Sequence, residues 1–371
     1  MKAMCVGGAM IDTIAIVGSD RIERMSMKNA DKDFLLIEEG RKIEAEEVST
    51  HVGGGAINAA VAMARLGLDV SVLAKVGQDA RAEVIFDHLL REKVSTRWMV
   101  RDGRAPTGAA VMFSSHDRNA AIFTARGANT LLETADLREE AFSVDLLYVS
   151  SLSNESADAF PEIVARGRAN KAMIATNPRV RQLASRGDTL QKLLRDIDII
   201  AVNASEAGVM VPALVARFGE ARTRLALPGD GAGEGAPPRL ALGFTSGTHD
   251  MSFASFFAAM RELGTRYTVV TDGRHGAFVG TAEAIYHCPV LETKVAGTAG
   301  AGDAFNATFS VFTALRASPE QALRAAAINA ASVVTYVDTQ SGLLAKAEIE
   351  RRRQSLEASL PVRQWPQAKF S

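Results

Sequence analysis

The chain has 371 residues, of which 47% are hydrophobic and 23% charged, so it has enough apolar material for a large buried core. Its 42 basic and 43 acidic residues leave a formal net charge of −1, which excludes the basic footprint of a nucleic-acid binder and argues against a membrane partner. No stretch reaches the roughly 18 apolar residues of a membrane span, and the N-terminus has no signal-peptide pattern. Two cysteines, Cys5 and Cys288, are too few for a disulfide framework, so we expect a reducing, cytoplasmic location.

Strand-like and helix-like patterns alternate along most of the chain. Short apolar runs predict strands at 3–6, 70–74, 145–149, 171–175, 197–202 and 267–271. Longer segments predict helices at 56–66, 81–91, 161–168, 303–315 and 319–336, a helix end at 190–195, and a charged helix at 347–359. This alternation favours an α/β fold with a mostly parallel sheet covered by helices on both faces.

Three regions interrupt the alternation. Residues 14–48 are polar and irregular apart from a short apolar run at 34–37. In 107–128, two apolar runs flank a polar tip at 114–119, a pattern that predicts a β-hairpin. Residues 211–250 contain a Gly- and Pro-rich loop at 228–238, and we interpret the whole segment as an irregular insertion.

The most informative motif is GTAGAGD at 297–303, which runs directly into a helical pattern. Small residues allow a tight turn that exposes backbone N–H groups at the helix N-terminus, where the helix dipole favours an anion. Asp303 would be a poor phosphate ligand, but beside an anion pocket it could accept a proton from an incoming hydroxyl. The alternative is a plain helix cap. The motif is neither a Walker loop nor a dinucleotide fingerprint.

A second glycine cluster, GGGAINAAVAMARLG at 53–67, is followed by VGQD at 76–79. Together with the 297–303 motif it resembles the ribokinase-like (PfkB) family of sugar and nucleoside kinases, in the family's order and over nearly the whole chain. The resemblance implies a single kinase domain, 1–371, with a three-layer α/β/α sandwich. It also implies a β-sheet lid formed by about 13–50 and 106–128, which would exclude water from the reaction.

The resemblance further implies ATP-dependent transfer of the γ-phosphate to a hydroxymethyl group of a sugar, with Mg²⁺ and with Asp303 as general base. The residues that would carry this chemistry fall into four groups. The catalytic group is Gly300, Ala301, Gly302 and Asp303; the substrate group is Asp12, Gly53, Gly54, Asn58 and Asn129; the ATP group is Asn203, Thr271, Gly273, Gly276, Thr298 and Asn329; and Glu206 would hold the metal through water.

Some of these residues also have structural interpretations. Asn203 and Glu206 have the spacing of a helix capping box, the loop from Thr271 could be a simple β-turn, and Asn329 could be a packing residue. Gly297 stands where the family usually has Asp, which puts activation by a monovalent cation in doubt.

Two alternatives to a sugar kinase stay open at this point. A nucleoside kinase of the same family would need an aromatic wall, which Trp98, Phe113 and Phe123 could supply. A sugar-sensing homologue without catalytic activity belongs to a different functional class. Loss of Asp303 or of the glycine turn would indicate such a protein, and both are present in this chain. A Rossmann oxidoreductase is disfavoured because the residues after the first strand lack the GxGxxG spacing. A homodimer formed through the lid is a further expectation.

Overall fold

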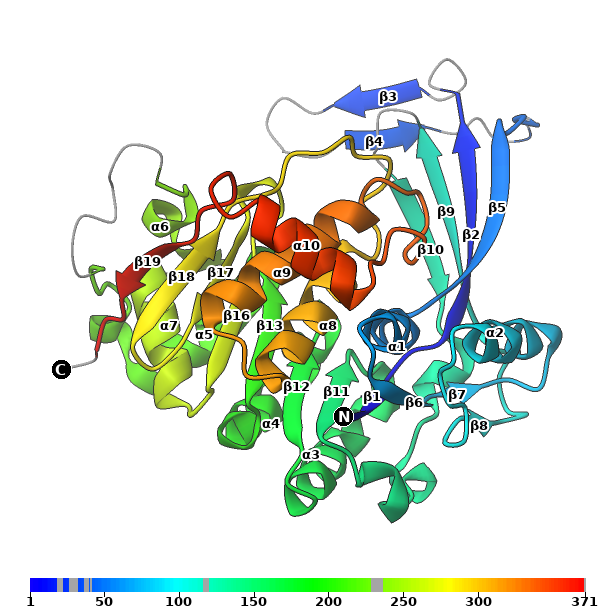
Figure 1. Ribbon diagram of the computed structural model, residues 1–371, viewed down its shortest axis with the longest axis horizontal. Helices are drawn as coiled ribbons and strands as arrows, with labels where there is room; N and C mark the ends of the chain where they lie inside the picture. Colours follow the sequence, from blue (N-terminus) through cyan, green and yellow to red (C-terminus); the bar gives the residue numbers. More distant parts are fainter. Residues whose placement is uncertain are drawn as a thin grey trace.

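The computed structural model describes residues 1–18, 23–26, 33–36, 40, 42–115, 120–227 and 236–369. Within these residues the main sheet has nine strands, in the order β19-β18-β17-β16-β13-β12-β11-β1-β6 (Figure 1). The six strands from β16 to β6 run parallel, and the three at the other edge are antiparallel. The bounds are β1 (Lys2–Val6), β6 (Asp69–Leu73), β11 (Leu146–Ser150), β12 (Met173–Asn177), β13 (Ile199–Asn203), β16 (Tyr267–Thr271), β17 (Ala277–Gly280), β18 (Ala284–Cys288) and β19 (Arg363–Pro366).

Two hydrophobic cores lie on opposite faces of this sheet, because successive side chains of a strand point to opposite sides. In β1, Ala3 and Cys5 belong to one core, and Met4 and Val6 belong to the other. Strands buried on both faces need continuous apolar runs, which explains why the sequence pattern identified the parallel strands.

Helices cover both cores and complete a three-layer α/β/α sandwich, which confirms the predicted fold class. Figure 1 shows α8, α9 and α10 in front of the sheet. The core that these three helices cover also contains residues of α1 and α2. On the other face of the sheet, helices α3, α4, α5 and α7 pack into the second core. The bounds are α1 (Gly55–Arg65), α2 (Ala80–Arg91), α3 (Phe160–Ala169), α4 (Val180–Leu193), α5 (Ala204–Phe218), α6 (Arg239–Leu242), α7 (Phe253–Glu262), α8 (Ala301–Ala314), α9 (Pro319–Val333) and α10 (Lys346–Ser355). No helix within the described ranges is long and apolar enough to cross a membrane.

A smaller sheet with the order β10-β9-β2-β5 stands beside the main one, at the upper right of Figure 1. Its strands are β2 (Met10–Val17), β5 (Glu47–Gly53), β9 (Gly108–Ser115) and β10 (Ala120–Ala125). Strands β9 and β10 form the predicted hairpin, whose tip at 116–119 lies outside the described residues.

The interpretation of 14–48 as irregular is wrong at both of its ends. Strand β2 continues to Val17 and β5 begins at Glu47, because each is paired along its length in the small sheet. Between them, β3 (Glu23–Ser26) pairs with β4 (Asp33–Leu36), and most of the remaining residues of this segment, including Ile37, lie outside the described residues.

The segment 211–250 also differs from the irregular insertion that we expected. It begins inside α5, which continues through Pro212 to Phe218 because Val211, Leu214 and Val215 are buried in the core. It ends in a hairpin of β14 (Phe244–Ser246) and β15 (His249–Met251). Residues 228–235 lie outside the described residues.

The remaining elements are short. Strand β7 (Lys75–Val76) pairs with β8 (Val100–Arg101). The 3-10 helices are η1 (Gly127–Thr130), η2 (Thr134–Asp136), η3 (Glu139–Phe142), η4 (Asn154–Ala159), η5 (Leu194–Asp196), η6 (Glu220–Arg222) and η7 (Gly273–His275).

The carboxyl ends of the parallel strands form one polar edge. Strands β11, β12, β13 and β16 end at Ser150, Asn177, Asn203 and Thr271. The small sheet is attached at this edge, because β2 begins only four positions after β1 ends at Val6. Ligands of open α/β sheets bind at such carboxyl ends, so the fold places a candidate site between this edge and the small sheet.

Lys75 provides a test of the packing beneath this edge. Its side chain is only 2% exposed, and its Nζ lies 2.8 Å from a carboxylate oxygen of Asp136 and 3.2 Å from one of Asp102. A Lys75→Met variant keeps the volume but leaves these carboxylates without their buried partner, so we expect a loss of about 3 kcal/mol in the free energy of unfolding.

Urea denaturation measures this loss. Arg351→Met is the matched control, because it breaks an exposed pair with Glu348 and should cost less than about 1 kcal/mol. Equal costs for the two variants would contradict a structural role for the buried ion cluster.

Candidate active site

The site is centred on Asp303, in the first turn of α8. Helix α8 follows Gly300, which has a left-handed conformation with φ of 79°; a Cβ there would lie 2.6 Å from Cβ of Thr339. Glycine is therefore required at this position. No side chain caps the helix N-terminus, and Asp303 is only 4% exposed.

Two side chains hold the Asp303 carboxylate. The Asn58 amide donates a 2.8 Å hydrogen bond to Oδ2, and Arg179 donates one of 3.1 Å to Oδ1. Asn58 belongs to α1, so this contact joins the two glycine motifs across 245 positions of sequence. The structure thus brings together the two segments that the sequence analysis singled out.

A hydrogen-bond network fixes Asn58 in turn. Its Oδ1 accepts bonds of 2.9 Å from both Thr339 Oγ1 and Gln340 Nε2. Gln340 also donates to the carbonyl of Val52, and its Oε1 lies 2.7 Å from Nε2 of His88. The carboxylate is therefore oriented by a chain of buried amides.

Asp12 supplies a second carboxylate to the same site. It lies in β2 against Gly53, where a Cβ would collide with the Asp12 carboxylate. Burial, and then the negative charge of Asp303, raise the pKa of Asp12 to about 6. Gly54 precedes α1 with φ of 101° and lies against the backbone of Gly8.

Asn129 is bonded to the backbone rather than directed into an open site. Its Oδ1 accepts a 2.8 Å bond from the amide of Ala9, and its Nδ2 donates to the carbonyls of Ala9 and Arg126 at 2.8 and 3.0 Å. These bonds tie the β1–β2 connection to η1.

Asn203 and Glu206 form a capping box at the start of α5, as the structural alternative anticipated. Asn203 Oδ1 accepts from the amide of Glu206 at 2.8 Å, and a Glu206 carboxylate oxygen accepts from the amide of Asn203 at 2.9 Å. Burial raises the pKa of Glu206, although the positive charge of Arg179 opposes this shift.

The remaining candidate residues lie at the turn after β16, in the segment before α8 and in α9. Thr271 ends β16 and leads into a tight turn in which the amide of Asp272 donates to the carbonyl of Gly276. A Cβ at Gly273 would have nothing within 4 Å, and Thr298 is exposed. Asn329 is fully buried; it donates to Thr308 Oγ1 and accepts from the amide of Leu344.

The polar groups at this site fit a magnesium ion bound together with a nucleotide better than a metal ion held by protein side chains alone. Among the described residues there is no cluster of three His, Cys, Asp or Glu side chains that could hold a metal. Magnesium characteristically keeps waters and takes one or two carboxylates together with substrate phosphates. The uncapped N-terminus of α8, with open space around Gly302, fits the phosphates themselves.

Sequence reasoning missed Arg179, which lies directly beside Asp303. The available signal was the Asn177-Pro178-Arg179 run at the end of β12, because polar residues at the end of a parallel strand lie at the carboxyl edge.

Solved structures with the ribokinase fold share the architecture of this protein. A protein from E. coli provisionally named ribokinase II, solved with ATP and Mg²⁺, superposes with a TM-score of 0.72 at 18% identity, covering 95% of this chain and 99% of that one. A nucleoside kinase from Methanocaldococcus jannaschii gives 0.68 at 16% identity, covering 95% and 98%.

The PfkB family carbohydrate kinase model matches residues 2–223 and 246–346, so the chain belongs to this family. A deoxyribokinase from Salmonella typhi is 25% identical over 332 residues, covering 88% of this chain and 94% of the relative. The protein is therefore an ATP-dependent kinase of the sugar and nucleoside class.

The raised pKa of Asp12 predicts a pH-dependent stability. The folded state holds this proton up to pH about 6, whereas the carboxyl in the unfolded chain loses it near its ordinary pKa of 3.8. The folded state therefore loses stability as pH rises from 4 to 6, and an Asp12→Asn variant should be more stable than the parent at pH 8, by about 2 kcal/mol.

The comparison requires urea unfolding of both proteins at pH 4 and pH 8, with the difference disappearing at pH 4. Glu348→Gln is a control for which the pH dependence of stability has the opposite sign. Hydrogen bonds from Arg351 and Arg352 lower the pKa of Glu348 to about 2, so this carboxylate stabilises the folded state at high pH. If the free energies of unfolding of Asp12→Asn and the parent differed by the same amount at both pH values, the raised pKa of Asp12 would be refuted.

Proposed function

We propose that this protein transfers the γ-phosphate of ATP to a hydroxymethyl group of a sugar, with Asp303 as the general base. The observation that carries the proposal is a buried carboxylate in the first turn of an uncapped helix. Phosphoryl transfer depends mainly on positioning and on stabilisation of charge, and this arrangement offers both.

The backbone N–H groups of Ala301, Gly302 and Asp303 would stabilise the transferring phosphoryl oxygens. They lie in the first turn of α8, where the helix dipole adds a partial positive charge. A Cβ at Gly302 would meet no atom within 4 Å, so there is room for an anion beside this turn.

Asp303 would accept the proton of the attacking hydroxyl. Arg179 occupies one carboxylate oxygen but is itself 58% exposed, so it can move aside for the acceptor and remain near the developing negative charge. Asn58 would keep the carboxylate oriented from the other side, and we assign it this positioning role in place of a direct bond to the sugar.

On the nucleotide side, Glu206 would hold Mg²⁺ through water, and ATP would contact Asn203, Thr271, Gly273, Gly276 and Thr298. Bound Mg²⁺ would neutralise phosphate charge during transfer. The hydrogen bonds and complete burial of Asn329 support a packing role for it instead of an adenine contact. Those of Asn129 likewise support a role in holding the β1–β2 connection.

The arrangement of aromatic residues favours a sugar over a nucleoside. Asp12 is paired in register with Ala110, and Ala110 with Thr124, so these three residues share one face of the small sheet. Phe113 and Phe123 occupy alternate positions and therefore project from the opposite face, away from Asp12. Trp98 is stacked with Arg97, at 4.5 Å from the guanidinium carbon to the ring centroid. The expected aromatic wall for a base is thus not assembled beside Asp12. The cytoplasmic location and the homodimer stay predictions.

An Asp303→Asn variant tests the assignment of the base. Without the carboxylate, kcat should fall by roughly a thousand-fold, whereas the affinity for Mg-ATP should be nearly unchanged. ADP release measures kcat, and calorimetry measures nucleotide binding. Glu348→Gln, the same type of change on the surface of α10, should retain full activity. A loss smaller than about tenfold would remove Asp303 as the base.

The glycine at position 297 predicts a weak response to potassium. A Cβ at Gly297 would lie 3.1 and 3.2 Å from the carbonyl oxygens of Tyr336 and Val337, so carbonyl groups are present there, but position 297 itself supplies no carboxylate to neutralise a cation. Activity should require Mg²⁺, and replacing Na⁺ by K⁺ at constant ionic strength should change kcat only weakly. Strong activation by K⁺ would show that the missing carboxylate is not needed.

A further inference from the structure

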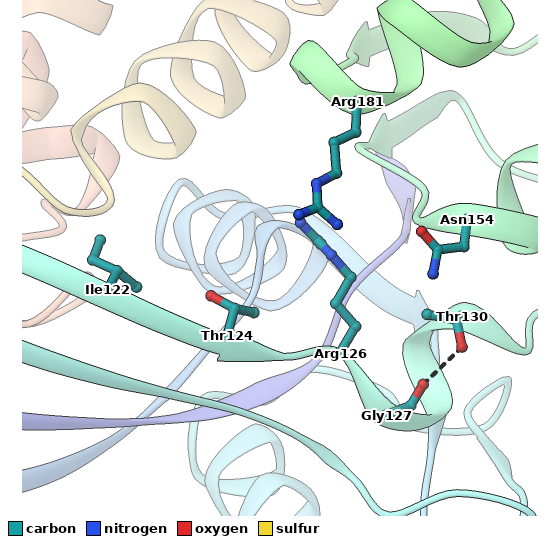
Figure 2. Close-up of a pocket in the computed structure, with 7 residues that line it drawn as sticks. All are labelled: Ile122, Thr124, Arg126, Gly127, Thr130, Asn154 and Arg181. Carbon is teal, nitrogen blue, oxygen red and sulfur yellow. Dashed lines mark hydrogen bonds between the residues drawn. The ribbon is translucent and has the colours of Figure 1, made fainter.

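A cavity of about 480 Å³ lies where the small sheet meets the main domain (Figure 2). It is lined by Ile122 and Thr124 of β10, Arg126, Gly127 and Thr130 around η1, Asn154 of η4 and Arg181 of α4. This volume is in the usual range of roughly 300 to 1,000 Å³ for small-molecule sites. None of the seven lining residues is aromatic or acidic.

Two guanidinium groups converge on this cavity. Figure 2 shows the side chains of Arg126 and Arg181 extending toward each other from opposite walls. Arg126 donates a 2.7 Å hydrogen bond to the hydroxyl of Ser153. Within the part of the chain that the structure describes, neither arginine has a carboxylate partner, whereas Arg101, Arg166, Arg186 and Arg351 each pair with a carboxylate.

Local electrostatics make this arrangement unfavourable without an anion. Burial, and then the positive charges of Arg181 and Arg179, lower the pKa of Arg126. Arg181 also lies in the first turn of α4, a helix with no acidic residue in its first turn, so its charge opposes the helix dipole. A bound anion would relieve both repulsions.

The cavity lies beside the proposed sugar site. Thr124 in the cavity wall shares a sheet face with Asp12, two strands and about 10 Å away. On the other side, Arg181 lies only two positions after Arg179, which is bonded to Asp303. The site is therefore polarised, with Asp12 and Asp303 at one end and Arg126 and Arg181 at the other.

We propose that the acceptor is a small polyhydroxylated molecule carrying a carboxylate or phosphate, which Arg126 and Arg181 bind while its hydroxymethyl end lies at Asp303. This proposal rests on the proposed kinase function and narrows its substrate class to anionic sugars. The hydroxyl of Thr124 and the amide of Asn154 supply further hydrogen-bonding groups to the cavity wall.

The first experiment compares matched acceptors in an ADP-release assay with Mg-ATP. Gluconate and 2-keto-3-deoxygluconate represent carboxylates, with glucitol as the neutral six-carbon counterpart; fructose 1-phosphate represents phosphates, with fructose as its counterpart. We expect kcat/KM at least roughly 100-fold higher for one anionic acceptor than for its neutral counterpart, as two charge-assisted contacts would give. The KM of that acceptor should rise with ionic strength, because added salt screens the arginines.

The second experiment changes the arginines. Arg126→Met and Arg181→Met should each lower the anionic-to-neutral ratio of kcat/KM by roughly 10- to 100-fold, and the Lys variants should recover part of it. Arg351→Met, which removes a guanidinium from the exposed face of α10, is the control and should leave the ratio unchanged. Isothermal titration with the preferred anionic acceptor measures the same loss without catalysis.

The outcomes separate this inference from the proposed function. ADP release that favours the neutral acceptors, glucitol or fructose, and is insensitive to both arginine variants would uphold the kinase function and overturn the anionic substrate class. Binding of an anionic acceptor that depends on Arg126 and Arg181, without ADP release, would support the anion site and contradict the proposed transfer reaction. An absence of both binding and turnover with all five acceptors would count against both.

Discussion

The buried carboxylate of Asp303 imposes the strictest requirement on this molecule. An ionised group that is 4% exposed must be paired or hydrogen-bonded, because burial without partners would cost several kcal/mol. Asn58 and Arg179 satisfy it from two different elements, α1 and the start of α4. Helices from the two opposite faces of the sheet are therefore tied to one group at the carboxyl edge.

The side chains that hold Asp303 need hydrogen-bond partners of their own, and neutral amide groups supply several of them. Asn58 can orient the carboxylate only because Thr339 and Gln340 bind its oxygen, and Gln340 is held in turn by Val52 and His88. Such a network is rigid when every member is satisfied, and it has little tolerance for the loss of one. It explains how a catalytic group can be placed precisely on a scaffold whose other contacts are mostly non-directional apolar packing.

Acidic and basic side chains lie on different sides of the site, and this asymmetry of charge would favour one orientation of a bound acceptor. Asp12 and Asp303 are close enough for the charge of Asp303 to raise the pKa of Asp12, whereas Arg126 and Arg181 line the neighbouring cavity. Arg179, which is bonded to Asp303, is also close enough to Arg126 to lower its pKa. The N-terminus of α8 adds a third feature, a neutral but positively polarised surface for phosphate. An acceptor bound between these groups would be oriented by its own charge distribution as well as by its shape.

The sequence by itself determined the layered α/β fold, because strands buried on both faces need continuous apolar runs and their helices need an apolar stripe, which are local patterns. It also identified the two glycine motifs, whose small residues are required by local backbone geometry at Gly300 and by close packing at Gly53. It did not identify β2, β5 or the edge strand β19, since these pair with strands far away in the chain. It also missed β17 and β18, although their partners are neighbouring strands. The contact of Arg179 with Asp303 and the convergence of Arg126 with Arg181 were decided only by the tertiary structure. Long charged side chains carry no periodic signal, so their partners depend on which elements the fold brings together.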